Sequence, residues 1–576
     1  MKTKQQNTRK LLKKHNITQT ILLLTIIVVI NIISIFAFYR FDLTKEKRFT
    51  ISDVSKKIIS NADDKILIEL YFEDNNLPVE LLRYQHIVKE FLKNFSSFSN
   101  KIELAFKHPY DKNDPNFTNS VYEQLYKKGL DPISINEETS TESSEKIIFA
   151  GALVKYQEDE YPVNLIHQNL NKGTNSGYLS EAELEKEFVH AIWMLLRTQI
   201  QKIAFLEDHG ELNENQTHDI MTSLSKYYQI DRLKMNNQLS ALDNYAVVVI
   251  AKPSKYFSER DKFIIDQYLM RGGKIIWLVE WTQISMDSLQ SKVSQITNIN
   301  AINIEDQLFN YGVRINPDLI QDLQCLYIPV FVNTLDGQPQ FEPKPWYYFP
   351  LILPDSLETN QLVKNIDPIR TNFVSSIDTV GNNPNVKKTI LLSTSNFSKT
   401  IMHPIDVSLN ILRQKPDYKT FSKNNIPIAV LLEGKFASNY QNRLTLDFVE
   451  NNEFNVLDES DPKAKIIVIS DGDLIRNEYK SMGEKIQHYP LGYDKYYSQQ
   501  FTPGNTQFMV NCINYLCANE SFISLRMREI KIRLLNQTKV TQDRTFWTIT
   551  NTTVPILVIL LFGIALNLFR KLKYKK

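Results

Sequence analysis

Cysteine is scarce in this sequence, with three residues in a chain of 576. An odd, widely spaced set of this kind forms no disulfide framework, even in an oxidising compartment. Cys512 and Cys517 fall on one predicted helix and point from different faces of it. We expect neither a disulfide nor a shared metal ion there. We interpret Cys512 and Cys517 as small hydrophobic side chains of the core. The third cysteine is Cys325.

The sequence also lacks the motifs on which nucleotide hydrolysis and nucleophilic catalysis depend. Gly272-Gly273-Lys274-Ile275 has neither the earlier glycine nor the Ser or Thr after lysine that a phosphate-binding loop requires. Gly434-Lys435-Phe436 fails in the same way. No Gly-x-Ser-x-Gly or Gly-x-Cys-x-Gly segment occurs, so a hydrolase or amidotransferase nucleophile is missing from its usual place. These absences predict a chain that is not an enzyme and needs no cofactor.

Neither sign of charge predominates in the chain. The formal net charge is +2, and the body has no dense run of Lys and Arg interleaved with aromatic residues. Proteins that bind nucleic acids present such a basic surface to the phosphates. We therefore expect no nucleic-acid partner.

Charged residues are absent from two long stretches, Ile17–Tyr39 and Trp547–Phe569. A helix rises about 1.5 Å per residue, so about 20 apolar residues cross a hydrocarbon core about 30 Å thick. Each stretch is predicted to be a transmembrane helix. The first has no small-x-small cleavage site before Arg40, which favours an uncleaved anchor over a signal peptide. The alternative for the second stretch is a buried core helix, but Trp547 and the basic residues that follow favour a membrane span.

Basic residues flank both stretches on the side of the chain ends. They are Lys2, Lys4, Arg9, Lys10, Lys13 and Lys14 at one end, and Arg570, Lys571, Lys573, Lys575 and Lys576 at the other. Because basic flanks stay in the cytoplasm, we predict cytoplasmic tails over 1–16 and 570–576 and an extracytoplasmic body. Other basic residues just inside the body oppose this signal: Arg40, Lys45, Lys47, Arg48, Lys531, Arg533 and Arg544.

The first part of the body, residues 40–178, alternates strand and helix patterns. The predicted elements are strand Ile66–Phe72, helix Val79–Phe95, strand Ile102–Phe106, helix Val121–Lys128, a polar loop Ser140–Ser144, and a hairpin of Ile147–Tyr156 and Glu160–Leu165. This β-α-β-α-β-β order predicts an α/β, thioredoxin-like domain. The likeness is architectural only, since no Cys-x-x-Cys motif is present.

A second α/β pattern covers residues 179–535 and begins with a capping box at Ser180 and Glu183. The predicted strands are Ile203–Leu206, Ile230–Met235, Tyr245–Ala251, Lys274–Val279, Ile428–Leu432 and Ile466–Ile469, and the helices are Asp219–Tyr227, Ser258–Met270 and Asn505–Leu516. Such alternation predicts a doubly wound, flavodoxin-like sheet with right-handed crossovers. We expect an irregular insertion at about 286–425, where Asn, Pro and Ser are frequent, and a membrane-proximal linker over 536–546.

Polar side chains follow two of the predicted strands at the points where they end. His209 and Glu211 come after one strand, and Asp471 and Asp473 come after another. The carboxyl edge of an α/β sheet is where ligands bind, so these four side chains are candidates for a metal or charged-ligand site. The alternative is that Gly210 and Gly472 make tight turns with solvated polar neighbours. The spacing matches no fixed ligand pattern.

Several segments, taken in order between the two apolar stretches, resemble one family. They are Phe41–Ser52, Ile203–Glu211, Tyr245–Pro253, Asp266–Leu278, Gly504–Leu516 and Ile523–Leu535. As an ordered set they closely resemble the gliding motility-associated ABC transporter substrate-binding (auxiliary) proteins, the GldG family, and cover nearly the whole chain. One departure is Asp208, where the family often has glycine, so no glycine-loop ligand role is assigned to it.

The resemblance implies an accessory subunit in the inner membrane of a Bacteroidetes bacterium, with a periplasmic body. It implies two partners, a GldF-like ABC permease and a GldA-like ABC ATPase, and it leaves open whether copies of this chain associate. It also implies that the second domain is a degenerate amidotransferase-like module, of the kind found in intraflagellar-transport proteins. No catalytic residue is carried over from the family.

The leading hypothesis is therefore a non-catalytic extracytoplasmic subunit that is mechanically coupled to an ATP-driven membrane partner. A second hypothesis is an envelope scaffold that organises motility or secretion machinery without transport. A third is a hydrolase on the amidotransferase-like sheet, which would need a nucleophile at a strand end.

Overall fold

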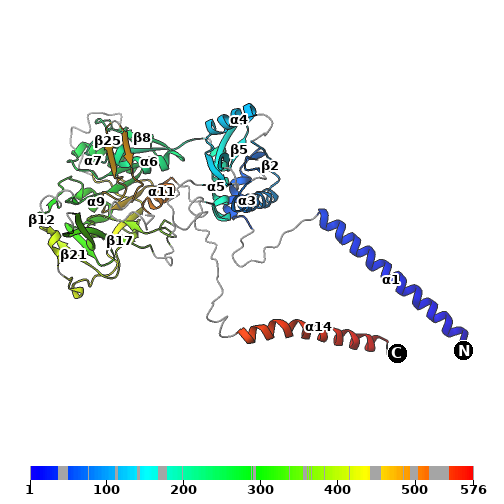
Figure 1. Ribbon diagram of the computed structural model, residues 1–576. Coiled ribbons are helices and arrows are strands. Elements are labelled where there is room, and N and C mark those ends of the chain that lie inside the picture. Colours follow the sequence, from blue (N-terminus) through cyan, green and yellow to red (C-terminus); the bar gives the residue numbers. More distant parts are fainter. Residues whose placement is uncertain are drawn as a thin grey trace. The chain divides into compact units, whose positions relative to one another are not determined.

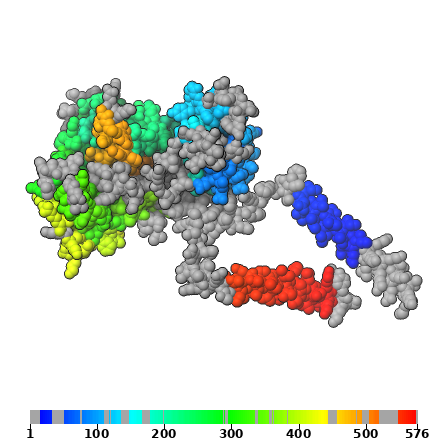
Figure 2. Space-filling model, viewed as in Figure 1, coloured from blue at the N-terminus to red at the C-terminus, as the bar shows by residue number. Residues whose placement is uncertain are grey.

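A computed structural model places a long helix at each end of the chain, α1 (Lys2–Phe36) and α14 (Arg544–Tyr574) (Figure 1). Within them, the windows His15–Ile32 and Phe546–Leu572 are long and apolar enough to cross a membrane, and none of their side chains is buried within the chain (Figure 2). The first apolar stretch is thus helical as far as Phe36 and the second is helical throughout, and the exposed apolar surfaces of the two helices are compatible with membrane anchoring.

The chain divides into two compact units, one made of Met1–Thr50 with Glu529–Lys576 and the other of Ile51–Arg528. The structure describes all residues except 1, 37–49, 75–76, 110–114, 139–142, 167–177, 198, 287–288, 290–293, 336–337, 355–359, 361, 365, 382, 414, 442–455, 484, 493–503, 518–543 and 575–576. The stretch Ile523–Leu535, most of Phe41–Ser52 and most of the predicted linker over 536–546 lie outside the described residues.

A four-stranded sheet with the order β2-β1-β5-β6 organises the first part of the larger unit. Its elements are α2 (Asp53–Ser60), β1 (Ile66–Leu70), α3 (Val79–Ser97), β2 (Ile102–Phe106), α4 (Pro115–Lys127), β5 (Gly151–Tyr156), β6 (Asp159–Asn164) and α5 (Glu181–Leu196). β1 is parallel to β2 and antiparallel to β5. The core on one face includes Phe95 of α3 and Phe188 of α5, whereas Leu125 of α4 packs against Leu153 on the other face.

The predicted hairpin of this part is confirmed for β5 and β6, but its first strand is shorter than expected. The predicted strand is interrupted at Ala150. The residues before it form a separate strand, β4 (Ser143–Phe149), which pairs with an unpredicted strand, β3 (Pro132–Glu138). Ser143 and Ser144 of the predicted polar loop therefore start a strand, and residues 140–142 lie outside the described residues.

A seven-stranded sheet with the order β20-β23-β24-β10-β9-β7-β8 forms the second part. Its strands are β7 (Lys202–Leu206), β8 (Gln229–Leu233), β9 (Val247–Ala251), β10 (Lys274–Leu278), β20 (Val386–Ser393), β23 (Pro427–Gly434) and β24 (Lys465–Ile469). The five strands from β24 to β8 are parallel, as predicted. β23 runs antiparallel to both of its neighbours, so the sheet is mixed rather than wholly parallel.

Helices cover both faces of this sheet because alternate strand side chains point to opposite sides. One face packs against α6 (His218–Ser225), which η1 (Asn215–Thr217) precedes, and α11 (Asn505–Leu516), and that core includes Cys512 and Cys517. The other face packs against α7 (Glu259–Met270) and α9 (Glu305–Tyr311) around Trp277. The interpretation of Cys512 and Cys517 as core residues is confirmed, since both are buried, and Cys325 is buried as well.

The segment expected to be an irregular insertion contains regular pairs of strands instead. They are β11 (Thr282–Gln283) with β13 (Asn298–Ile299), β12 (Ser294–Ile296) with β22 (Asp406–Ser408), β14 (Val313–Ile315) with β19 (Ile377–Thr379), β15 (Asp318–Asp322) with β21 (Ser398–Met402), and β16 (Cys325–Leu335) with β17 (Gln338–Ile352) and β18 (Ile369–Arg370). The 3₁₀ turns η2 (Leu409–Arg413) and η3 (Tyr418–Thr420) follow. Prolines and two register shifts between β16 and β17 hide the strand alternation in the sequence.

The seven-stranded part begins and ends at neighbouring positions. Gln201, just before β7, donates a hydrogen bond from Nε2 to the carbonyl oxygen of Cys517, just after α11, at 3.4 Å. A further hairpin of β25 (Tyr479–Met482) and β26 (Lys485–His488) lies between β24 and α11 in the chain. The entry and exit of the polypeptide are therefore adjacent.

Candidate functional site

The carboxyl ends of β7, β9, β10 and β24 lie at one edge of the seven-stranded sheet, because these four strands are parallel. The order of strands changes direction between β7 and β9, since β8 lies on one side of β7 and β9 on the other. In open α/β sheets ligands bind outside the strand ends at such a point. A ligand site of this sheet is therefore expected in the loops that follow these strands.

The ring of His209 fills the crevice at this change of direction. It is buried and stacks on the buried ring of Phe257, with ring centres 3.6 Å apart and planes 10° from parallel. Its Nε2 lies 3.2 Å from Oδ2 of Asp261, and its Nδ1 lies 3.5 Å from Oε1 of Glu211. Burial opposes protonation, but the Asp261 and Glu211 carboxylates outweigh it and raise the pKa of His209 to about 9. His209 is a cation held between two carboxylates at neutral pH.

The backbone around His209 is also held in place. Its carbonyl oxygen accepts hydrogen bonds from the N–H groups of Ser254 and Lys255, at 2.8 and 2.9 Å. Gly210 follows with a φ of +72°, and a Cβ there would lie 2.3 Å from Oγ of Ser254. Only glycine tolerates both conditions without a shift of the loop.

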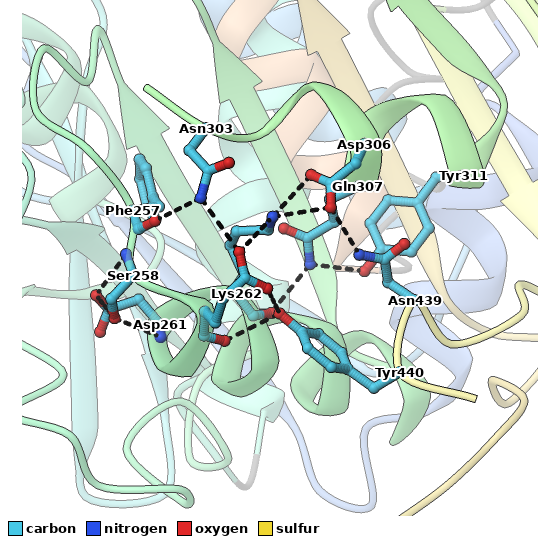
Figure 3. A network of polar contacts seen from close by, with 11 residues as sticks. Phe257, Ser258, Asp261, Lys262, Asn303, Asp306, Gln307, Tyr311, Asn439 and Tyr440 are labelled. Carbon is cyan, nitrogen blue, oxygen red and sulfur yellow. Dashed lines mark hydrogen bonds and ion pairs between the residues drawn. The ribbon is translucent and has the colours of Figure 1, made fainter. Parts of the chain in front are cut away.

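Helix α7, which carries Asp261, is fixed by a polar network drawn in Figure 3. Ser258 and Asp261 form a capping box at its first turn. Nζ of the buried Lys262 contacts Asp306 of α9 at 2.7 Å, and Nε2 of Gln307 donates to the carbonyl of Lys262 at 3.0 Å (Figure 3). Tyr440 donates to the carbonyl of Glu259 from the segment after β23. This network holds Phe257 and Asp261 against His209.

A second cluster lies at the ends of β9, β10 and β24. Nζ of Lys252 contacts Oδ2 of Asp473 at 2.6 Å and Oε2 of Glu280 at 3.5 Å. Arg476 contacts the other oxygen of Asp473 at 3.3 Å. Asp471 accepts the N–H groups of Asn372 and Asp473, at 2.9 and 2.8 Å. Asp473 thus lies between two cations, and Asp471 stabilises the turn after β24 by accepting these two backbone hydrogen bonds.

Burial and charge separate the three carboxyl groups of this second cluster. Burial, with the charge of Asp473, raises the pKa of Asp471 to about 7. Burial also raises the pKa of Glu280 well above its usual range, against the opposing effect of Lys252. Burial acts in the same direction on Asp473, but Lys252 and Arg476 outweigh it and lower the pKa of Asp473. Of the three carboxyl groups, Asp473 is the one whose surroundings favour the ionised form.

The four predicted site residues are therefore placed in two separate clusters at the same edge. His209 and Glu211 lie at the end of β7, whereas Asp471 and Asp473 lie at the end of β24, and β9 and β10 run between them. Within the described part of the chain, no group of three or more His, Cys, Asp or Glu side chains is arranged to hold a metal ion. Whether the four residues bind a ligand stays a prediction.

Open space lies beside the second cluster. Two adjoining cavities, of about 40 and about 100 Å³, share one set of lining residues. The shared residues are Arg370, Asn372, Asp473, Arg476 and Glu478. We call this space the Arg370 cleft.

Of the shared lining residues, the sequence prediction includes Asp473 alone. Arg476 and Glu478 carry a weak signal, since they continue the polar turn that begins at Asp471. Arg370 and Asn372 carry no such signal. They lie in and beside β18, which pairs with β17, and no local sequence pattern predicts this pairing.

Residues 201–512 match the model of a family described as an ABC-type uncharacterized transport system, and this match spans more than half of the chain. The chain belongs to this family. Membership in the ABC-type transport family supports an accessory role in such a system. Residues 45–155 match a second model, described as a domain of unknown function.

Relatives outside the family models are distant. An uncharacterized protein of Borreliella burgdorferi is 21% identical over 573 residues, covering 96% of this chain and 97% of its own. Among solved structures, the N-terminal domain of mmIFT52 is 15% identical over 55% of this chain and 97% of that one, with a TM-score of 0.30. A ThuA-like protein of Bacteroides uniformis is 11% identical over 55% and 91%, with a TM-score of 0.26. Assignment to the ABC-type transport family therefore rests on the sequence match.

Proposed function

We propose that this chain is a non-catalytic, membrane-anchored auxiliary subunit of an ABC transport complex, which associates with a permease and an ATPase. The observation that carries the proposal is the family match over 201–512 in a chain that has an apolar helix at each end. The ATPase hydrolyses the nucleotide, and this chain transmits or receives the resulting conformational change.

The filled crevice supports the non-catalytic part of the proposal. A nucleophile at a strand end needs an open position beside it for the substrate. At the end of β7 that position is taken by the ring of Phe257, which stacks on His209. The buried cysteines supply no alternative, because burial raises the pKa of Cys512 and Cys517 and disfavours the thiolate.

The orientation in the membrane follows from the charge at the chain ends. Both termini are cytoplasmic and the body between the anchors is periplasmic, as the basic residues before α1 and at the end of α14 favour. Two anchors then restrict the orientation of the body as well as its location.

The narrower form of the proposal is a gliding-motility complex, with a GldF-like permease and a GldA-like ATPase. Its support is the ordered set of segments that resembles the GldG family. In this form the first part of the body, with its β2-β1-β5-β6 order, is a thioredoxin-like domain, and the seven-stranded part is an amidotransferase-like domain. The scaffold hypothesis shares every one of these features except dependence on the ATPase.

Capture from detergent-solubilised membranes tests the proposal. A tagged full chain, expressed with its genomic neighbours, is expected to retain a permease and an ATPase in stoichiometric amounts. Recovery of neither partner would refute it. If deletion of the ATPase leaves the cellular function of this chain intact, the scaffold replaces the transport subunit.

Labelling of introduced cysteines tests the topology separately. Lys57→Cys and Tyr256→Cys lie on exposed positions of the body, and the native cysteines are buried and give little background. An impermeant maleimide applied to spheroplasts is expected to label both variants but to label Lys2→Cys only after lysis. The reverse pattern would place the body in the cytoplasm.

A further inference from the structure

One face of the β16–β17 hairpin is apolar and exposed. Residues 331–334 of β16 and 338–343 of β17 are exposed, whereas residues 346–350 at the base of the hairpin are buried. Residues that lie directly opposite each other in an antiparallel pair share a face, and so do residues two positions apart. The register places six apolar side chains on one face, which we call the Phe331 ribbon: Tyr327, Pro329, Phe331, Phe341, Pro343 and Pro345.

The aromatic rings of the Phe331 ribbon lack a cover within the described part of the chain. Tyr327, Phe331 and Phe341 are 50%, 55% and 57% exposed, and the rings of the two phenylalanines contact each other with centres 6.1 Å apart. A contiguous exposed apolar face of this kind marks a surface that binds something. The three prolines of the ribbon supply no N–H group, so its edges are poorly suited to pairing with a further strand. The occupant must therefore cover the face.

A cluster of cations lies at the base of the ribbon. Tyr347, just beyond the ribbon in β17, packs on Phe421 with ring centres 5.7 Å apart, and Ile411 of η2 packs against the same pair. Nζ of Lys399 lies 4.5 Å from the centre of the Phe421 ring, and Lys423 pairs with the start of β21 through its backbone. The cations of β21 and of the segment that contains η2 and η3 form what we call the Lys419 patch: Lys399, Arg413, Lys415, Lys419 and Lys423.

The positive charge of the Lys419 patch is not balanced locally. Residues 397–423 contain five basic and two acidic residues, so this segment alone carries +3, against +2 for the whole chain. One of the two acidic side chains, Asp417, accepts the N–H group of Lys419 at 3.1 Å. Among the residues that the structure describes, none of the five cations forms an ion pair. Tyr418 and Phe397 are exposed between these cations.

We propose that the Phe331 ribbon and the Lys419 patch dock the body on an anionic bilayer surface, with the lysines on lipid phosphates and the ribbon rings at the boundary between headgroups and acyl chains. A basic patch complements anionic headgroups, and aromatic rings favour the interface of a membrane. A bilayer suits both features at once, because it presents phosphates and apolar chains side by side without demanding a complementary shape.

The two apolar helices would keep such a surface within reach. Residues 37–50 separate α1 from the larger unit, and an extended chain of this length spans about 50 Å. Tethering of this kind raises the effective concentration of the docking surface at the bilayer. The proposal goes beyond the accessory role. It rests on the membrane anchoring of the proposed function, but it needs neither a permease nor an ATPase.

Lipid quenching of a label on the hairpin tests the docking. The full chain with Val332→Cys, which keeps the six side chains of the ribbon, carries an environment-sensitive fluorophore in vesicles that contain a brominated lipid. The native cysteines are buried and give little background. We expect strong quenching when phosphatidylglycerol is present and weak quenching in phosphatidylcholine alone. A label at Tyr256→Cys, an exposed position outside both features, should be quenched in neither. Flotation with the vesicles reports anchoring separately.

Variants in the Val332→Cys chain divide the effect between the two features. Lys419→Gln should lower the ratio of docked to undocked body by about fivefold, and its combination with Lys399→Gln and Lys423→Gln by about a hundredfold. Lys419→Arg should preserve docking, because it keeps the charge. Phe331→Ser with Phe341→Ser should remove the quenching and leave flotation unchanged. Lys480→Gln is the control, since Lys480 is an exposed lysine of the β25–β26 hairpin.

Four results would overturn the proposal. The first is a chain that floats with the vesicles but shows no quenching in either lipid. The second is equal quenching with and without phosphatidylglycerol, or an equal loss in Lys480→Gln and Lys419→Gln, because the patch would then have no part. The third is a label whose emission shifts to the blue but that no lipid quenches, which would mean that protein, such as a second copy, covers the ribbon. The fourth is a chain that does not float, which would overturn the anchoring as well.

Discussion

Two clusters of ionisable side chains lie at the same edge of the seven-stranded sheet, and they differ in what fills the space beside them. At the end of β7, the Phe257 ring stacks on His209, and Asp261 contacts its Nε2. At the end of β24, Asp473 and Arg476 border a cavity of about 100 Å³. At the position where α/β sheets usually bind ligands, packed side chains fill the space, whereas a cavity lies beside the end of β24.

Truncation of Phe257 should have the largest effect on stability among these substitutions, because it removes the ring that packs on His209. Phe257 is fully buried between His209 and Trp277, so Phe257→Ala leaves a cavity and should cost about 3–5 kcal/mol of the free energy of unfolding. Urea denaturation followed by tryptophan fluorescence measures this loss. Tyr256→Ala, at a side chain that is 64% exposed, is the control. Equal stability of the two variants would show that the crevice is not a packed core.

Replacement of His209 tests the charge in the filled crevice. His209→Gln should lower the free energy of unfolding by about 2 kcal/mol at pH 7, because it removes the cation between two carboxylates. The pKa of His209 is raised from 6.5 to about 9 on folding, so the protonated ring stabilises the fold. This contribution is complete below about pH 6.5 and is lost as the pH rises through about 9.

The difference in urea midpoint between the wild type and His209→Gln should therefore be large at pH 6 and should shrink toward pH 9.5. A difference that stays constant over this range would mean that His209 acts by packing alone.

The second cluster should respond to pH through the stability of the fold, with the smallest effect of the series. The pKa of Asp471 is raised to about 7, so between pH 6 and 8 it gains a negative charge beside Asp473, Lys252 and Glu280. The free energy of unfolding should fall by about 1 kcal/mol over this interval, because the folded chain binds this proton more tightly than the unfolded chain does. Asp471→Asn should flatten the profile. A profile that steepens or persists in that variant would remove Asp471 as the titrating group.

Much of the fold could be predicted from local patterns. The parallel strands from β24 to β8 are short apolar runs bounded by polar turns, and Ser180 and Ser258 mark the starts of α5 and α7 by capping. The edge of the sheet could not be predicted. β20 pairs with β23 only after the chain has crossed the insertion, and its burial pattern lacks the alternation of an ordinary strand.

The residues of the candidate site also differ in whether a local sequence pattern indicates them. His209 and Asp473 stand in sequence beside the strands that position them, so residue type and spacing indicate them. Phe257 and Asp261 are indicated only as the start of a helix, and their contact with His209 depends on the packing of α7. Arg370 comes from a distant strand, β18, and no local pattern links it to Asp473.

The neighbouring positions of Gln201 and Cys517 have a mechanical consequence. A pull along the polypeptide enters and leaves the seven-stranded part at adjacent points, which the Gln201–Cys517 hydrogen bond of 3.4 Å joins. The whole force passes through this part, because it is continuous with the chain on both sides. The force therefore acts first on the few contacts between the start of β7 and the end of α11.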